Sequence, residues 1–402
     1  MPLATWNTAT FPQDLAVKSF SGMITTLYPN GQAPLFGISS MLTEETAHQP
    51  EHGYYSKTMI FPSVVLSAGG QLIGDTTFTV LSTVDIMPGM LLQSDTTKEN
   101  ILVVTVPSAT TITVARAIGT VAAAAIAASV RLYMIGNAYE EASVRPASLV
   151  IVPTRYINYT QIFRNTWLVS GTAAATGVIA GPAVDAATKG DCSLFHSSDI
   201  EKSILFGQTF TGTRNNFPFR TMNGLINYIT QQAAGNISTL GATTTYTQLE
   251  NALDPAFNQV TDPKNAAERL LFVGGIARRV IHQICRLNST YMINDQVTEW
   301  GLQFDTIKIP RGRFNLVEHP LLNAFGSSAS WSRMALGIDL STFSLAYMRG
   351  RKTVARDFGA SGTPVDNGID AVGGTLTTEL TCLVKNAPAN VQLLNFTAPA
   401  VG

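Results

Sequence analysis

The chain has 402 residues, and this length predicts two or three packed units rather than one small core. Charged residues make up 13% of the chain, about half of the roughly 25% that is typical of soluble domains. The net charge of -1 provides no basic excess, which argues against dedicated, tight binding of nucleic acid. Low charge instead favours a surface covered by uncharged polar residues or by neighbouring copies, because obligate interfaces are depleted in charge.

The sequence also disfavours the secreted, membrane and disulfide-rich classes. The start, MPLATWNTATF, lacks the positive residues and apolar core of a signal peptide. The longest run of small apolar residues, TVAAAAIAASV, is too short to span a bilayer, which takes about 20 residues. Cys192, Cys285 and Cys382 are far apart, so we expect reduced, buried thiols in a protein with no membrane partner.

The first half of the chain is predicted to be an extended arm followed by strands. Residues 1 to about 45 combine several prolines and glycines with short apolar groups, which favours an arm lying on a partner. From Phe78 to Tyr133, short β-branched runs separated by turn residues predict a small all-β module. Between Pro146 and Gly171 further strands are expected, and Pro153 suits an edge or a long β-loop.

Helices are expected next. Gly181 and Pro182 favour the start of a helix and Gly207 favours its end, whereas Gly190 disfavours a continuous helix between them. One continuous helix over this stretch would be about 37 Å long. The segment RTMNGLINYITQQA, residues 220–233, predicts a second helix with one apolar stripe.

The remainder predicts an α+β domain. Asp262 and Pro263 are expected to begin a helical region. Within this region the segment RLLFVGG fits a strand better than a helix, and the segment IARRVIHQICRL that follows is expected to be a helix. The segment DTIKIPRGRFNLVEH predicts a hairpin that turns at Pro310 to Gly312. The alternating segment GGTLTTELTCLVKN can close a sheet.

The charged stretch SSDIEKSILFG raises the question of an active site. Asp199, Glu201 and Lys202 stand at i, i+2 and i+3, and three such positions on a helix cannot converge on one substrate. We therefore interpret these residues as a solvated or subunit-interface face of the helix.

Other candidate chemistry is equally weak. His48 and His52 have the i, i+4 spacing of zinc ligands on a helix, but Pro50 between them would break that helix. Cys192 and His196 share this spacing, but no third or fourth ligand is identifiable. For this second pair we therefore favour a buried core thiol at Cys192 and an exposed imidazole at His196. The glycines of FVGGIARR fit a tight strand-to-helix turn better than a phosphate site. We predict no catalytic residue, no metal and no cofactor.

The strongest cationic cluster is MRGRKTVARDF. Arg349, Arg351, Lys352 and Arg356 could contact DNA nonspecifically or pair with acidic groups on an adjacent subunit, and we favour the subunit contact.

Several long segments carry a resemblance to a known family. They are FSGMITTLYPNGQAPLFGISS, HGYYSKTMIF, GNAYEEASVRPASLVIVPTRYINYTQIFRNTWLVSGTA, SSDIEKSILFG and GGTLTTELTCLVKNAPAN. With the predicted order of elements, they resemble the major capsid proteins, or major head proteins, of tailed bacteriophages. The resemblance implies the α+β Hong Kong 97-type fold, here with a small all-β insertion.

The resemblance also implies a domain organisation. Residues 1–40 would be the N-terminal arm, and residues 41–175 the extended β-loop with the module inserted at about 75–135. Residues 176–219 would be the peripheral domain with its spine helix, 220–345 the axial domain, and 346–402 the C-terminal return to the peripheral domain.

The implied function is self-assembly into hexamers and pentamers that form the icosahedral head shell around double-stranded DNA. The virion capsid would be assembled in the host bacterial cytoplasm, with a portal, a decoration protein and nonspecific contact with packaged DNA. No long charged pro-region precedes the arm, which implies a separate scaffolding protein, and no lysine lies between Lys98 and Lys189, which implies a noncovalent shell.

Three alternatives stay open. One is the shell of a cellular encapsulin-like nanocompartment, which would enclose an enzyme. The second, of a different class, is a soluble hydrolase whose site is not recognised. The third is a tail or decoration protein.

Overall fold

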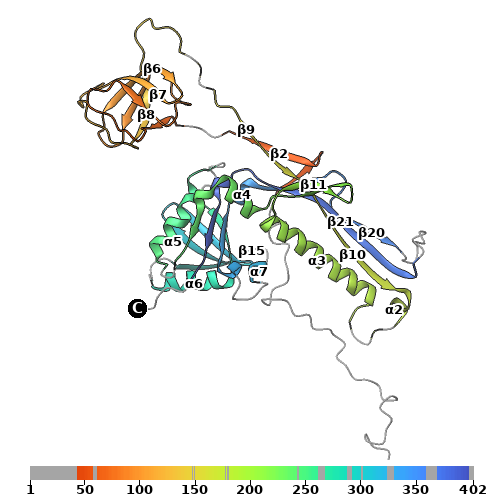
Figure 1. Ribbon diagram of the computed structural model, residues 1–402. Coiled ribbons are helices and arrows are strands. Elements are labelled where there is room, and N and C mark those ends of the chain that lie inside the picture. Colours follow the sequence, from red (N-terminus) through yellow and green to blue (C-terminus); the bar gives the residue numbers. More distant parts are fainter. Residues whose placement is uncertain are drawn as a thin grey trace, which may run out of the picture. The chain divides into compact units, whose positions relative to one another are not determined.

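A computed structural model describes residues 43–57, 61–146, 148, 150–176, 178, 181–241, 244–260, 268–287, 292–299, 302–323, 330–358 and 369–397 (Figure 1). The chain divides into two compact units, one formed by Tyr55–Arg155 and the other by Met1–Tyr54 together with Tyr156–Gly402. The predicted arm at 1–40 and the predicted helix start at Asp262 lie outside the described residues.

The unit Tyr55–Arg155 is built on a six-stranded antiparallel sheet in the order β3-β8-β5-β6-β7-β4. Strands that alternate buried and half-exposed residues, such as TITVA in β7, place one face in a single apolar core around Phe78 and Leu132. The strands predicted between Phe78 and Tyr133 are therefore confirmed. The bounds are β3 Ser63–Val65, β4 Thr77–Thr79, β5 Met90–Ser94, β6 Asn100–Ser108, β7 Thr111–Ala115 and β8 Arg131–Asn137.

A buried ion pair joins the loops of this module. Arg116 Nη2 donates to Glu99 Oε2 over 2.6 Å and Arg116 Nε donates to Glu99 Oε1 over 3.0 Å, and the two side chains are 6% and 0% exposed. Arg116 also donates to the carbonyl oxygens of Leu72, Ile73 and Ala124. One arginine thus holds two backbone segments and the Glu99 carboxylate, because its guanidinium offers five donors in a fixed plane.

The first sheet of the larger unit has five strands in the order β1-β19-β21-β10, with β20 also paired to β21. Helix α3 packs against β10 and β21, and Trp167, Cys192 and Leu376 share a small core there (Figure 1). The strand predicted at GGTLTTELTCLVKN is confirmed, but it lies in the middle of the sheet rather than closing it. The bounds are β1 Thr43–Ala47, β10 Gln161–Ser170, α2 Gly171–Ala175, α3 Val184–Phe206, β19 Phe343–Met348, β20 Val354–Phe358 and β21 Ala371–Val384.

Helix α3 is the single long helix that the sequence predicts. Its 23 residues span about 34 Å, and the helix continues through Gly190. Gly207 ends the helix for a steric reason. A Cβ at this position would lie 2.4 Å from the Ser203 carbonyl oxygen and 2.7 Å from that of Met222, so only glycine allows the two segments to approach.

The second sheet has seven strands in the order β13-β22-β18-β14-β17-β16-β15. Strand β14 is buried from Arg269 to Val273, and both of its faces are covered: Leu270 and Phe272 contact the core that holds α4, while Leu271 and Val273 contact the core that holds α5 and α6. The predicted step from RLLFV to the following helix is confirmed, as is the hairpin of β16 and β17. The bounds are β13 Ile237–Thr239, α4 Leu225–Gln232, α5 Tyr246–Leu253, β14 Glu268–Val273, α6 Gly275–Leu287, β15 Met292–Glu299, β16 Leu302–Ile309, β17 Gly312–Glu318, β18 Ala335–Ile338 and β22 Val391–Leu394.

Two short ribbons stand outside these sheets. Strand β2 (Glu51–Ser56) pairs with β9 (Thr154–Tyr159), and the β-module occupies the sequence between them. Strand β11 (Phe210–Arg214) pairs with β12 (Phe217–Thr221). The helix predicted at 220–233 therefore begins only at Leu225, because Arg220 and Thr221 belong to β12. Single turns of helix are η2 Ala234–Asn236, η3 Asp254–Phe257, α7 Pro320–Asn323, η5 Ser330–Arg333, η6 Leu340–Thr342 and η7 Ala387–Ala389.

Candidate functional site

The charged residues of α3 point to two different sides of the helix. Asp199 and Lys202 are half-exposed and form an ion pair with 3.5 Å between Oδ1 and Nζ. Asn165 Nδ2 on the neighbouring strand β10 donates to Asp199 Oδ2 over 3.1 Å, which fixes the carboxylate. These two residues stand on an outer face of the helix, as predicted.

Glu201 is a correction to the prediction of one exposed face. It is 1% exposed, and its Oε1 lies 3.3 Å from His319 Nε2, whose side chain is also buried. The His319 ring packs edge-on against Phe272, with 5.3 Å between the ring centroids. A buried carboxylate needs a hydrogen-bonding partner, and here that partner comes from a distant loop. Glu201 holds α3 onto the core of its own chain and cannot belong to an exposed interface.

The cationic cluster is also engaged differently from the prediction. Arg351 Nη1 lies 2.9 Å from Glu379 Oε2, and Lys352 Nζ lies 2.5 Å from Glu44 Oε2 on β1, so both cations have acidic partners in their own chain. The hydrogen bond with Glu44 raises the pKa of Lys352. Arg349 and Arg356 are exposed and form no ion pair with a residue that the structure describes. Of the cluster, these two remain free for a contact outside the chain.

The histidine and cysteine pairs have structural roles. His196 is buried, not exposed as predicted: its Nδ1 is 2.7 Å from Asn165 Oδ1 and its Nε2 is 2.7 Å from Thr378 Oγ1. Burial lowers the pKa of His196 and raises the pKa of Cys192. His52 lies 3.5 Å from Glu45. Within the described ranges, no group of three or more His, Cys, Asp or Glu residues could hold a metal ion.

The two glycines before α6 make a tight turn, as predicted. A Cβ on Gly274 would lie 2.5 Å from the backbone oxygen of Ser332. The N–H of Gly275 donates to Asn323 Oδ1 over 2.6 Å, so a side chain of the same chain already occupies a donor at the helix start.

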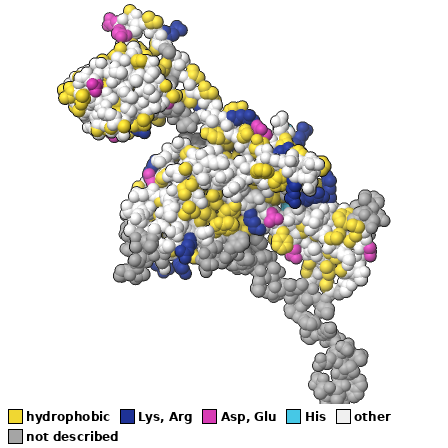
Figure 2. Space-filling model, in the orientation of Figure 1, with side chains coloured by type: hydrophobic (Ala, Val, Ile, Leu, Met, Phe, Trp, Pro, Cys, Tyr) yellow, Lys and Arg dark blue, Asp and Glu magenta, His cyan; other side chains and the backbone are white. Residues whose placement is uncertain are grey.

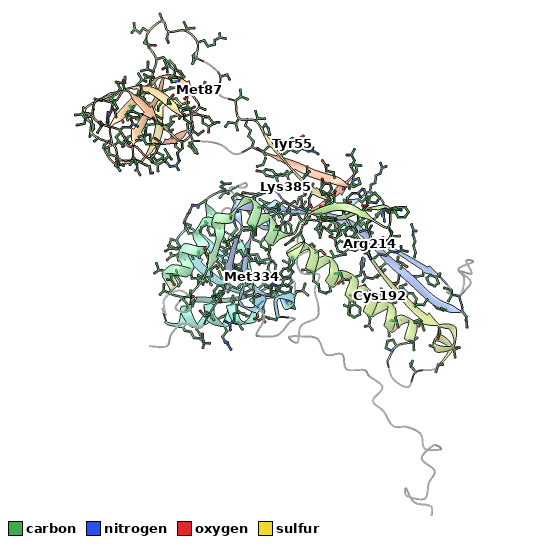
Figure 3. All side chains as sticks on the ribbon, in the orientation of Figure 1. Tyr55, Met87, Cys192, Arg214, Met334 and Lys385 are labelled. Carbon is green, nitrogen blue, oxygen red and sulfur yellow. The ribbon has the colours of Figure 1, made fainter. Side chains whose placement is uncertain are left out.

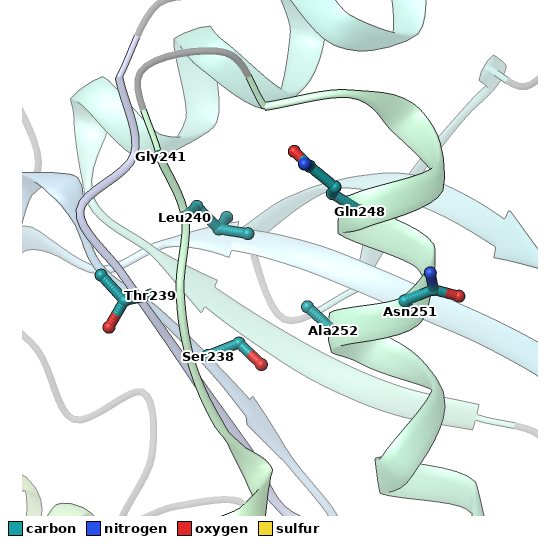
Figure 4. A pocket seen from close by; sticks show the side chains of 7 residues that line it. All are labelled: Ser238, Thr239, Leu240, Gly241, Gln248, Asn251 and Ala252. Atoms are coloured by element: carbon teal, nitrogen blue, oxygen red, sulfur yellow. The ribbon is translucent and has the colours of Figure 1, made fainter.

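One described pocket lies between β13 and α5 (Figure 4). It has a volume of about 340 Å³, and its lining contains no charged residue, histidine or cysteine. The lining residues are Ser238, Thr239, Leu240, Gly241, Gln248, Asn251 and Ala252. Such a lining offers hydrogen bonds but no general base for a nucleophile.

No helix among the described residues is long and apolar enough to cross a membrane.

The surface feature that the sequence analysis missed is the hairpin of β11 and β12. Asn215 and Asn216 form its turn, with positive φ angles of 51° and 62°. Asparagine tolerates such angles, so an Asn-Asn dipeptide between two segments that contain aromatic residues is a sequence signal for a hairpin. Three phenylalanines of this hairpin are exposed: Phe210, Phe217 and Phe219. Figure 2 shows Lys and Arg side chains gathered near the position at which Figure 3 labels Arg214 at the tip of the hairpin.

The described part of the chain thus presents exposed aromatic side chains and unpaired arginines, and it brings together none of the residue sets that we weighed for catalysis. Exposed aromatic residues and arginines are the residue types enriched in protein interfaces, so these features favour the class of proteins that contact other macromolecules.

The comparisons with known proteins identify the family. Residues 4–397 match the family model of the SU10 major capsid protein, so the chain belongs to this family of phage major capsid proteins. A curated major capsid protein of Pseudomonas phage PaMx41 is 35% identical over 386 residues, which cover 93% of this chain and 91% of that protein. The resemblance noted from the sequence is confirmed.

Solved structures show weaker likenesses. The capsid of a native GTA particle matches with a TM-score of 0.48 and 9% identity, covering 98% of this chain and 100% of that one. The SrpI encapsulin of Synechococcus elongatus PCC 7942 matches with a TM-score of 0.46 and 10% identity, covering 98% and 97%. The encapsulin alternative is not favoured, because both the family model and the curated relative are phage capsid proteins.

Proposed function

We propose that copies of this chain assemble into hexamers and pentamers that close into the icosahedral head shell of a tailed bacteriophage, around its double-stranded DNA. The match of residues 4–397 to a major capsid protein family carries the proposal. The low charge of the chain supports it, since surfaces that tile against copies are depleted in charge. Many modest contacts in a closed symmetric shell add up to high stability.

We place the parts of the Hong Kong 97-type architecture as follows. The five-stranded sheet with α3 would be the peripheral domain and its spine helix, and the seven-stranded sheet would be the axial domain. The β2–β9 ribbon would be the extended loop, with the β-module inserted in it. In this placement β10, a strand of the five-stranded sheet, would belong to the peripheral domain, and β22, a strand of the seven-stranded sheet, would belong to the axial domain.

The proposed role is structural, without catalysis and without a cofactor. Expected partners beyond further copies of the chain are a separate scaffolding protein, a portal, a decoration protein and the packaged DNA, contacted nonspecifically. Exposed Arg349 and Arg356 are the members of the cationic cluster that can make such outside contacts. Assembly would take place in the host cytoplasm, before the shell becomes part of the virion.

Electron microscopy of the chain expressed with its neighbouring genes tests this proposal directly. Closed shells of uniform size are expected. A protein that stays monomeric by light scattering under all conditions, and that turns over a substrate, would instead support the hydrolase alternative.

The shell is proposed to be noncovalent, because no lysine lies between Lys98 and Lys189, where the loop strand returns. Denaturing electrophoresis of intact particles should therefore give a single band at the chain mass of 43.0 kDa. A ladder of higher masses under reducing conditions would contradict this expectation.

A further inference from the structure

The β11–β12 hairpin is a two-stranded ribbon with little cover from its own chain. Its residues are exposed or half-exposed along both strands. A single two-stranded ribbon is only marginally stable in water unless a further surface covers it. The hairpin therefore has the properties of an element that gains its cover from another molecule.

One face of the hairpin carries most of its aromatic surface. The register pairs Gly212 with Phe219 and Arg214 with Phe217, and directly opposite residues of an antiparallel pair share a face. Phe210 stands two residues before Gly212 and shares that face. The exposed fractions of Phe210, Phe217 and Phe219 are 54%, 74% and 38%. We call these three residues together with Arg214 the aromatic–arginine face.

The hairpin carries positive charge and no acidic residue. Arg214 is exposed and lies on the aromatic–arginine face, whereas Arg220 is half-exposed and lies opposite Thr211 on the other face; neither forms an ion pair with a described residue. Gly212 keeps the face flat, because a Cβ there would lie 2.8 Å from the ring of Phe210. Aromatic residues and arginine are the residue types enriched in protein interfaces. A partner must offer an apolar spot flanked by negative charge.

Helix α3 offers such a surface. Phe195 is 66% exposed, and Asp191 and Asp199 stand four residues before and after it, on the same side of the helix. Asp191 is exposed, and the Asp199 side chain is 47% exposed. We call these three residues the acidic–aromatic stripe. Figure 3 labels Cys192, which lies in the same part of α3.

We propose that the aromatic–arginine face of one copy docks on the acidic–aromatic stripe of a second copy. Within one chain the two surfaces do not cover each other, since Phe195 and Phe217 both remain largely exposed. The charges are complementary, with exposed Arg214 on one side and exposed Asp191 on the other, whereas Asp199 is already paired with Lys202. Because the two surfaces differ, the contact is heterologous, and repeated heterologous contacts form a ring where the rotation between copies closes. The inference rests on the proposed shell function and names one of its contacts.

Packaged DNA is the less suitable partner for the hairpin. Phosphates are held by cations, and the hairpin has only two arginines beside three exposed phenylalanines. Exposed phenyl rings gain more by packing against Phe195 than against a charged DNA backbone.

Cross-linking between two different single variants tests the contact. Chains carrying Phe217→Cys are mixed with chains carrying Phe195→Cys, assembled, and oxidised mildly; the native cysteines do not interfere because all three are buried. Disulfide-linked dimers are expected in the mixture and not in either variant alone. A chain with both substitutions should give a ladder that ends at closed rings of five or six. Shells that form normally without any such cross-link would overturn the proposal.

Charge reversal provides a second, independent test. Arg214→Glu should slow shell assembly by about tenfold or more, and Asp191→Lys should do the same. Combining the two substitutions should restore most of the rate, because the complementarity is then re-formed with opposite sign. Arg131→Glu, on an exposed residue of the β-module, is the matched control and should leave the rate unchanged.

The outcomes separate the contact from the function. If the reversed chains assemble normally but the shells retain less DNA, the hairpin binds DNA and the proposal is wrong. If the two substitutions together assemble no faster than either one alone, the two surfaces do not meet. A wild-type chain that never forms shells would overturn the shell function itself, and with it this contact.

Discussion

Replacing Arg116 by Met removes the cation that neutralises Glu99 inside the β-module. The wild-type pair is almost fully buried, and Glu99 also accepts from the backbone N–H groups of Ala117 and Ala124, over 3.1 and 3.3 Å. Burial by itself raises the pKa of Glu99, but the bonds from Arg116 and from these two N–H groups outweigh burial, so the pKa lies below its ordinary value of 4.5. The substitution leaves a buried carboxylate without its cation.

The expected cost follows from this burial. Removing one partner of a buried ion pair costs about 3–5 kcal/mol, because the remaining charge stays desolvated. Arg116 additionally holds the carbonyl oxygens of Leu72, Ile73 and Ala124, which must find water instead. The β-module should therefore open about a hundredfold or more as often, since about 1.4 kcal/mol is a factor of ten.

Hydrogen exchange of the full chain, followed by mass spectrometry, measures this opening within the segment 61–146. Lys98→Met is the control: it breaks an exposed pair with Asp95, with 3.3 Å between the charged atoms, and should change stability by less than about 1 kcal/mol. A change for Arg116→Met as small as for this control would refute the reasoning.

The pH dependence gives a second criterion for the same residue. A carboxyl group with a depressed folded pKa stabilises the fold above its unfolded value, and this contribution is lost as the pH falls through the folded pKa. In Arg116→Met the bonds from the N–H groups of Ala117 and Ala124 remain but the cation is gone, so the pKa of Glu99 should be higher than in wild type. The variant module should therefore lose less stability than the wild-type module as the pH falls through the folded pKa of wild-type Glu99.

Three further changes have defined outcomes. Burial raises the pKa of Tyr54 to about 12, so the stability of the wild-type chain should fall as the pH rises from 10 to 12. Tyr54→Phe removes this ionisable group and also the 2.6 Å hydrogen bond to the Val384 carbonyl oxygen. Denaturant titrations of this variant should therefore show a smaller fall in stability over the same pH range. Gly53→Ala would put a Cβ 2.2 Å from the Tyr156 carbonyl oxygen, so hydrogen exchange should rise in β2 and β9; unchanged protection would contradict the backbone contact. Burial lowers the pKa of His196, so stability should be lost as the pH falls below 6.5, and His196→Gln should flatten that dependence in urea titrations at several pH values.

The surroundings of the charged residues chosen as interface candidates could be predicted from the sequence only in part. The i, i+3 spacing of Asp199 and Lys202 predicts a pair on one side of a helix, and the pair is there. The inward direction of Glu201 depends on His319, which is 118 residues away in the chain. The partners of Arg351 and Lys352 come from β21 and β1, strands that only the sheet places beside them. Long-range pairing of this kind leaves no local pattern in the sequence.

The sequence by itself determined the elements whose signals are local. Strand runs between turn residues, the uninterrupted helix before Gly207 and the turn at Pro310 follow from backbone sterics and from periodic burial, which act over a few neighbouring residues. Tertiary structure alone decided which strands became neighbours, that β21 lies in the middle of its sheet, and which charges are buried. These outcomes depend on the free energy gained when apolar faces of distant segments are buried against one another. This free energy depends on which segments meet, and no local stretch of the sequence specifies that.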